Sequence, residues 1–200
     1  MVATTFDEWK YTDAVYCMTV FLDCLLEEFL ASARGVKGLE KIVLGTEKGR
    51  AIGLGMTGYH SAIQERSFTW GGFEAHMFNM ELYKALRDGS TKATKWMAKV
   101  WGEPEWCKGT GLRNTHNVSS SLIFGSKSQG GTPWYGNVYF EGSASGEMYR
   151  VNPAFIDILK AHGKYNDDVL QTVLSDNGSV RKLDFLTDHE KEVLLTAFEI

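Results

Sequence analysis

The stretch "RAIGLGMTGYH", residues 50–60, decides how the fold is interpreted, because it sets three glycines in the spacing G-x-G-x-x-G. In a dinucleotide-binding fold this spacing follows a buried strand and opens a helix, and an acidic residue stands about twenty positions further on. Here only Ala51 and Ile52 separate the glycines from a polar run, and the acidic residue at that distance, Glu74, stands at the start of an expected helix. We therefore favour a second interpretation, in which small residues let a bend and a helix pack closely against neighbouring backbone. A free-standing NAD-binding module is the weaker alternative, and titration with NAD would test it.

The composition is that of a soluble globular protein, with 44% hydrophobic and 23% charged residues in a chain of 200. The formal net charge is -4 and Lys and Arg do not cluster, so we expect no binding to nucleic acid, which needs several basic groups against phosphates. The chain has no apolar run of 18 residues, and residues 1–15 lack a basic start followed by an apolar stretch. We therefore expect no membrane span, no secretion and a cytoplasmic location.

The cysteines and histidines give no metal or redox pattern. Cys17, Cys24 and Cys107 are an odd number without C-x-x-C spacing, and we expect them to be buried, reduced thiols. The five histidines lack metal-ligand spacing, so no metal site is expected. No catalytic residue can be assigned from spacing alone.

The first half of the chain has the apolar periodicity of helices. A long helix is expected over residues 13–33, with Asp13 as its N-cap and an apolar face packed against something substantial. Further helices are expected over 39–48, after Gly58, and over 73–87 and 90–101.

The second half changes character. Residues 113–149 are rich in Ser, Gly, Asn and aromatic residues, and "SLIFG" (121–125) and "NVYF" (137–140) are predicted strands. Helices are expected to begin after Asn152, after Asn166 and at a capping box over 187–190, the last continuing to the C-terminal residue. Large apolar residues along that last helix suggest a continuation or a partner that covers them. The chain has no linker or internal repeat, so we treat residues 1–200 as a single α/β segment.

Four segments in order resemble the large (alpha) subunit of class I ribonucleotide reductase. The first is "RAIGLGMTGYHSAI", similar to the family's R-x-x-G-x-G-x-x-G-x-H run, and the second is "GEPEWCKGTGLRNTH", similar to its G-E-P-E…R-N segment. The others are "GEMYRVNPAFIDIL" and "NGSVRKLDFLTDHEKEVLLTAFEI". Because the four are spread over nearly the whole chain, the sequence is identified as a member of this family.

The resemblance implies part of a ten-stranded α/β barrel, helix-rich and after the loop that carries the radical cysteine. The radical and redox cysteines of the family match none of the three cysteines here, so the chain is expected to be inactive alone. The family implies partners: the remaining pieces of the large subunit, the small (beta) subunit and a ribonucleoside diphosphate substrate. It also implies a di-iron/tyrosyl radical in the small subunit and thioredoxin or glutaredoxin as reductant, with no cofactor bound by this chain itself.

The site residues implied by the resemblance are Ser119, Ser120 and Ser121, in "RNTHNVSSSLIFG". They match the Ser/Thr-rich turn at a helix start that holds the substrate diphosphate, and short hydroxyls with free backbone N–H groups suit an oxyanion. Two departures stand against this role, because the Ala-Pro-x-x-x-Ser pattern is missing and Gly-Ile-Glu-Pro is replaced over 130–133 by Gly-Gly-Thr-Pro. The alternative is a decayed or repurposed barrel fragment that acts only as a non-catalytic binding or assembly protein.

Overall fold

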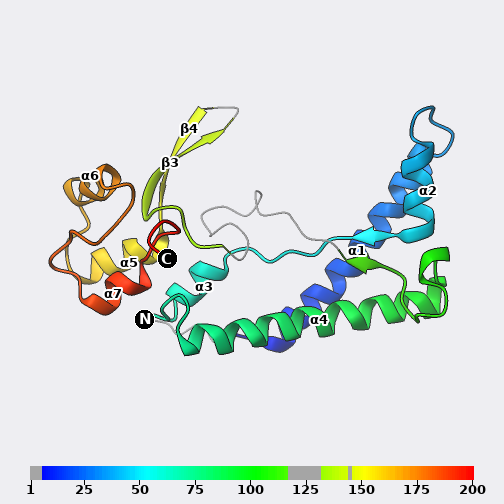
Figure 1. Cartoon of the computed structure of the whole chain (residues 1–200), viewed down its shortest axis with the longest axis horizontal. Helices are drawn as coiled ribbons and strands as arrows, with labels where there is room; N and C mark the ends of the chain where they lie inside the picture. The colour runs from blue at the N-terminus through cyan, green and yellow to red at the C-terminus, as the bar shows by residue number, and fades with distance from the viewer. Residues whose placement is uncertain (1–5, 117–131, 144–145) are drawn as a thin grey trace. The chain divides into compact units, whose positions relative to one another are not determined.

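The computed structural model describes residues 6–116, 132–143 and 146–200, and these divide into two compact units. Unit 1 contains residues 55–78 and 132–200, and unit 2 contains residues 6–54 and 79–116. The described elements are a set of helices, α1 (Glu8–Ala33), α2 (Glu40–Gly49), α3 (Tyr59–Gln64), α4 (Phe73–Trp101), α5 (Pro153–Ala161), α6 (Asp167–Ser175) and α7 (Asp188–Val193), a 3-10 turn η1 (Glu105–Cys107), and the strands β1 (Ala51–Ile52), β2 (Thr115–His116), β3 (Val138–Ser143) and β4 (Gly146–Val151) (Figure 1).

Unit 2 is built on the crossing of α1 and α4 (Figure 1). At the crossing Gly89 of α4 faces α1, and a Cβ atom at this position would lie 2.6 Å from the carbonyl oxygen of Thr12 and 3.0 Å from Val15 Cγ1. Only glycine permits this approach, because the contact on one side is backbone that cannot move aside. The short strands β1 and β2 of the same unit pair in parallel, with Ala51 opposite Thr115.

Unit 1 holds the larger apolar core. The antiparallel hairpin of β3 and β4 pairs Val138 with Val151, and Val138 is fully buried. The core consists of Val138, Phe155, Leu159, Leu170, Val173, Val180, Leu183, Leu186 and Leu194. It therefore draws on β3, α5, α6 and the segments around α7, and the hairpin is anchored at its base to this helical core.

Local signals for the helix starts in unit 1 are confirmed. The side chain of Asn152 accepts a hydrogen bond from Ala154 N–H ahead of Pro153, and Asn166 caps α6 by accepting from Val169 N–H. Thr187 and Glu190 form the predicted capping box of α7. The strand predicted over residues 137–140 is confirmed as part of β3, whereas the strand predicted over residues 121–125 lies outside the described residues.

Several helix predictions are wrong. α1 begins at Glu8, capped by Asp7, whose side chain accepts from Lys10 N–H, and Asp13 lies inside the helix. The helices predicted over 73–87 and 90–101 form the single helix α4, because Gly89 is tolerated where it lets α1 approach. α7 ends at Val193, well before the C-terminal residue, and Thr196 to Ile200 form a turn.

Candidate functional site

The serines that the resemblance implies as substrate contacts, Ser119, Ser120 and Ser121, lie outside the described residues. What the structure does describe is the strand that leads to them. β2 ends at His116, three positions before Ser119. The geometry just before β1 and β2 therefore fixes the start of the segment that carries the serines.

A buried carboxylate on α1 ties the two strand starts together. Asp23 is 1% exposed and accepts hydrogen bonds from Arg50, which precedes β1, at 2.8 Å (Nε) and 2.9 Å (Nη2). It also accepts from Arg113 Nε at 3.0 Å and from Asn114 Nδ2 at 2.6 Å, just before β2. Arg50 of the first family-like segment and Arg113 and Asn114 of the second thus donate hydrogen bonds to the same carboxylate.

The charges of this cluster balance. Arg50 Nη1 also donates to Glu27 Oε1 at 2.6 Å, so two guanidinium groups face two carboxylates. Burial by itself raises the pKa of Asp23, but the hydrogen bonds from Arg50, Asn114 and Arg113 outweigh it and hold this pKa below its ordinary value. Asp23 is therefore ionised at neutral pH, as the two buried arginines require.

The strand before the serines is also fixed to α4. The backbone N–H groups of Arg113 and Asn114 both donate to Thr94 Oγ1, at 2.8 and 2.9 Å. Arg113 Nη1 donates in addition to the carbonyl oxygens of Trp101 and Gly102 at the end of α4, at 3.0 and 2.8 Å. The start of β2 is thus held by both long helices of unit 2.

The other two family-like segments meet in unit 1, through a buried amide network. Asn152 Nδ2 donates to Gln64 Oε1 at 3.0 Å and to Asn137 Oδ1 at 2.9 Å. Asn137 Nδ2 donates to the carbonyl oxygens of Gly178 and Leu194, at 3.1 and 2.7 Å. The network therefore joins the segment after the glycine run to the family-like segments that begin at residues 146 and 177.

A buried histidine lies beside this network. The ring of His60 is fully buried, and its Nδ1 accepts a hydrogen bond from Trp134 N–H at 2.9 Å. Burial lowers the pKa of His60 to about 4. His60 is therefore neutral at physiological pH and acts as a structural acceptor.

This histidine is expected to make the chain less stable in weak acid. The unfolded chain takes up a proton near pH 6.5, whereas the folded chain does so only near pH 4, so the unfolded state binds more protons between these values. Stability should thus fall as pH drops from 6.5 toward 4, by about 2 kcal/mol at pH 5 relative to pH 8. Urea unfolding at a series of pH values measures this. His60→Asn keeps an acceptor near Nδ1 without the titration, and an unchanged pH slope in that variant would contradict the assignment.

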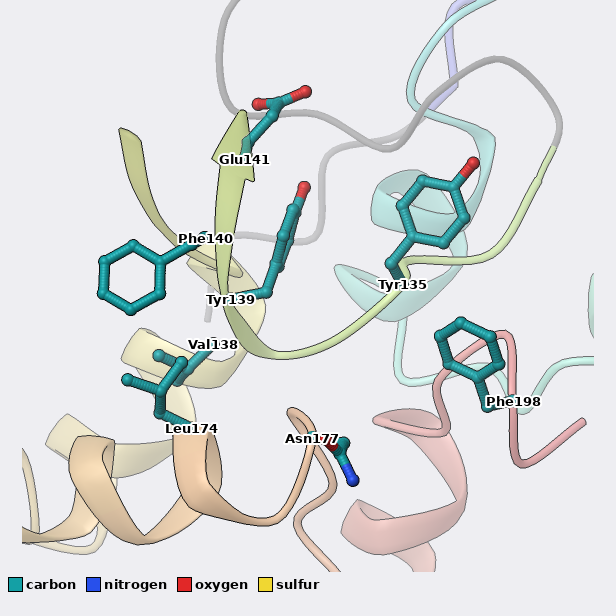
Figure 2. Close-up of a pocket in the computed structure, with 8 residues that line it drawn as sticks. All are labelled: Tyr135, Val138, Tyr139, Phe140, Glu141, Leu174, Asn177 and Phe198. Carbon is teal, nitrogen blue, oxygen red and sulfur yellow. The ribbon is translucent and has the colours of Figure 1, made fainter. Parts of the chain in front are cut away.

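An open aromatic pocket of about 470 Å³ lies at the hairpin base of unit 1. It is lined by Tyr135, Val138, Tyr139, Phe140, Glu141, Leu174, Asn177 and Phe198 (Figure 2). The rings of Tyr135 and Phe198, on facing segments, lie 6.4 Å apart, and Glu141 is paired with Arg150 at 2.7 Å. The lining is suited to an apolar or aromatic group and brings together no nucleophile and base.

The thiols do not form a redox or metal site in the described part of the chain. Cys107 is buried as expected, and burial raises its pKa, but Cys17 and Cys24 are exposed, so the prediction that they are buried is wrong. Their side of α1 faces outward because the buried face is the one that carries Asp23. Among residues 6–116, 132–143 and 146–200 no group of three His, Cys, Asp or Glu side chains could hold a metal ion. No helix described is long and apolar enough to cross a membrane.

Sequence reasoning missed the most connected residue of the site. Asp23 stands alone in "VFLDCLL", and a single carboxylate in such an apolar run is itself a signal, because a buried charge is retained only where it is paired. Its partners Arg50 and Arg113 were recognised only as letters of a family pattern. Asn137 and Gln64 carry no such signal, since isolated amides in a sequence are usually exposed.

Comparison with known proteins identifies the family. The model of the ribonucleotide reductase barrel domain matches residues 1–118 and 104–200. The ribonucleoside-diphosphate reductase large subunit of Invertebrate iridescent virus 6 is 30% identical over 98% of this chain and 21% of its own length. That of Invertebrate iridescent virus 3 is 28% identical over 98% of this chain and 32% of its length.

A solved structure agrees with these matches. The class Id ribonucleotide reductase alpha subunit of Actinobacillus ureae superimposes with a TM-score of 0.83 and 34% identity, over 96% of this chain and 36% of that one. The chain therefore spans about a fifth to a third of the length of these relatives. The helix-rich α/β fold of a partial barrel and the resemblance in sequence are both confirmed, and the chain belongs to the ribonucleotide reductase barrel-domain family.

Proposed function

We propose that this chain is one part of a ribonucleoside-diphosphate reductase large subunit. It contributes part of the barrel wall and binds the diphosphate of the substrate. One observation carries the proposal: Asp23 binds Arg50 and Arg113 and so fixes the starts of two neighbouring parallel strands. In α/β barrels the active site lies at the carboxyl ends of the strands. The glycine run of residues 53–58 follows β1 at that end, and Ser119–Ser121 follow β2.

The chemistry proposed for the serines is anion binding without basic side chains. Hydroxyl and backbone N–H donors form charge-assisted hydrogen bonds to phosphate oxygens. The family role then adds what this chain would not supply: the radical and redox cysteines on other pieces of the large subunit, and a small subunit with a di-iron/tyrosyl radical. Thioredoxin or glutaredoxin would provide the electrons, and the assembled enzyme would work in the cytoplasm to make deoxyribonucleotides for DNA synthesis.

The experiment begins with assembly. The purified chain alone is expected to show no reductase activity, whereas mixing it with the N- and C-terminal pieces of the subunit and the small subunit should yield deoxyribonucleotides. Calorimetric titration of that complex with a ribonucleoside diphosphate then measures the affinity for the substrate. Loss of two charge-assisted hydrogen bonds in the double variant Ser119→Ala/Ser120→Ala should weaken binding by at least about a hundredfold.

Ser175→Ala is the matched control, because this exposed serine at the end of α6 lies outside the proposed loop. Affinity that is equal in the double variant, the control and the wild type would contradict the phosphate role. Turnover by the isolated chain would contradict the proposal that other polypeptides supply the radical and redox cysteines. A complex that assembles but binds no nucleotide would favour the alternative, a non-catalytic assembly protein, which the altered Gly-Gly-Thr-Pro run over residues 130–133 motivates.

A further inference from the structure

Between residues 14 and 26 the outer face of α1 is apolar and without charge. The helix buries Val15, Thr19, Asp23, Leu30 and Ala33. On its other side Met18, Phe21 and Leu25 are 46%, 55% and 47% exposed. Between Asp13 and Glu27 the only charged residue is Asp23, which is buried, so the exposed surface of residues 14–26 carries no charged side chain.

The exposed residues form a regular stripe. Ala14, Met18, Phe21 and Leu25 follow one another at intervals of four, three and four, which is the spacing of an a/d seam between packed helices. Over these twelve residues the stripe is about 17 Å long, or three helical turns. Cys17 and Cys24 flank it and are exposed as well. We call these six residues the α1 stripe.

Three kinds of partner can be compared by chemistry. A helix that lies on a membrane surface carries Lys or Arg beside its apolar face, and the α1 stripe has none between residues 14 and 26. A nucleic acid requires basic groups, which are absent there for the same reason. A helix with its own apolar seam needs only complementary packing, and the alternating intervals of four and three residues match it.

We propose that the α1 stripe is the docking surface for an amphipathic helix of the remaining large-subunit polypeptide. This rests on the proposed function, in which such a polypeptide assembles with the chain. The length of the relatives indicates what the occupant is, since the chain covers only 36% of the class Id alpha subunit that shares its fold. A large part of that protein is thus polypeptide that this chain does not contain and that its uncovered helix face can pack against.

The two native thiols test the proposal without any substitution. In the isolated chain N-ethylmaleimide should modify Cys17 and Cys24 rapidly and the buried Cys107 slowly, as followed by mass spectrometry. In the complex assembled with the N- and C-terminal pieces, modification of Cys17 and Cys24 should slow at least tenfold, while Cys107 remains slow. Reactive thiols in a complex that has assembled and binds nucleotide would overturn the docking surface and leave the proposed function intact.

Variants distinguish specific docking at the α1 stripe from non-specific association of apolar surfaces. Phe21→Glu and Leu25→Glu should each weaken assembly at least tenfold, measured by analytical ultracentrifugation, while circular dichroism of the isolated chain stays unchanged because both side chains are exposed. Ile42→Glu on α2 is the matched control, being 56% exposed against 55% for Phe21, and it should assemble normally. Equal loss in the control would overturn the assignment to the α1 stripe.

Two further outcomes are informative. Thiol protection that appears in the chain alone and grows with its concentration would mean that a second copy covers the stripe, and would overturn the choice of occupant. Failure of the wild-type chain to assemble with the other pieces at all would overturn the proposed function and this inference together.

Discussion

Replacement of Asp23 by asparagine is expected to lower the free energy of unfolding by about 3–5 kcal/mol. The substitution keeps the shape of the side chain but leaves Arg50 and Arg113 without their shared counter-charge, and both arginines are at least nine-tenths buried. The cost comes from two desolvated cations and not from a cavity, which is why an isosteric change is sufficient. Urea unfolding of the wild type and the variant at pH 7 measures it.

Glu27→Gln is the matched control. Glu27 also pairs with Arg50, at 2.6 Å, but its side chain is 52% exposed, so water can replace the lost charge and the cost should stay below about 1 kcal/mol. Equal effects of the two substitutions would contradict the claim that burial makes Asp23 decisive. The pKa of Asp23 is held below its ordinary value, so its contribution is complete above about pH 4 and is lost as pH falls through the lower folded pKa. The deficit of Asp23→Asn should accordingly be constant from pH 8 to pH 5 and shrink in stronger acid.

Replacement of Asn137 by alanine is expected to cost about 3 kcal/mol, because it removes one hydrogen bond from each of two buried partners. The carbonyl oxygen of Leu194 loses its 2.7 Å donor, and Asn152 Nδ2 loses one of its two acceptors. Gly178 O is not orphaned, since the backbone N–H of Asn137 still donates to it at 2.9 Å. Urea unfolding of the whole chain, followed by circular dichroism, measures the loss.

Asn79→Ala is the control for this prediction, since that half-buried amide on α4 lies outside the network, and the change should be within about 0.5 kcal/mol. A double-mutant cycle with Asn152→Ala sharpens the test, because residues in one network are not additive. Coupling of Asn137 and Asn152 below about 0.5 kcal/mol would contradict a shared network.

Features that depend on neighbouring residues could be predicted from the sequence. The caps at Asn152, Asn166 and Thr187 are local hydrogen bonds between a side chain and a backbone group two or three residues away, so the sequence contains both partners. The same reasoning misplaced the start of α1, because Asp7 and Asp13 are both acceptable caps and apolar periodicity does not choose between them.

Features that depend on distant segments could not be predicted in this way. The apolar face of the first long helix was expected to pack against something substantial, but Met18 and Leu25 are exposed. The buried face of α1 contains Thr19 and Asp23 instead, because Asp23 meets arginines 27 and 90 positions further along the chain. Periodicity identifies an apolar face without saying which element covers it. The family resemblance supplied the barrel, and the role of Ser119–Ser121 stays a prediction.

The glycine at the crossing of α1 and α4 has a consequence for assembly. Since Gly89 has no side chain, the backbone of α4 lies close against α1 at Thr12 and Val15. An incoming helix would then meet a preorganised face and would lose little conformational entropy in ordering it, which favours tight association. The absence of a side chain at Gly89 of α4 would thus favour the binding of a partner helix to the α1 stripe.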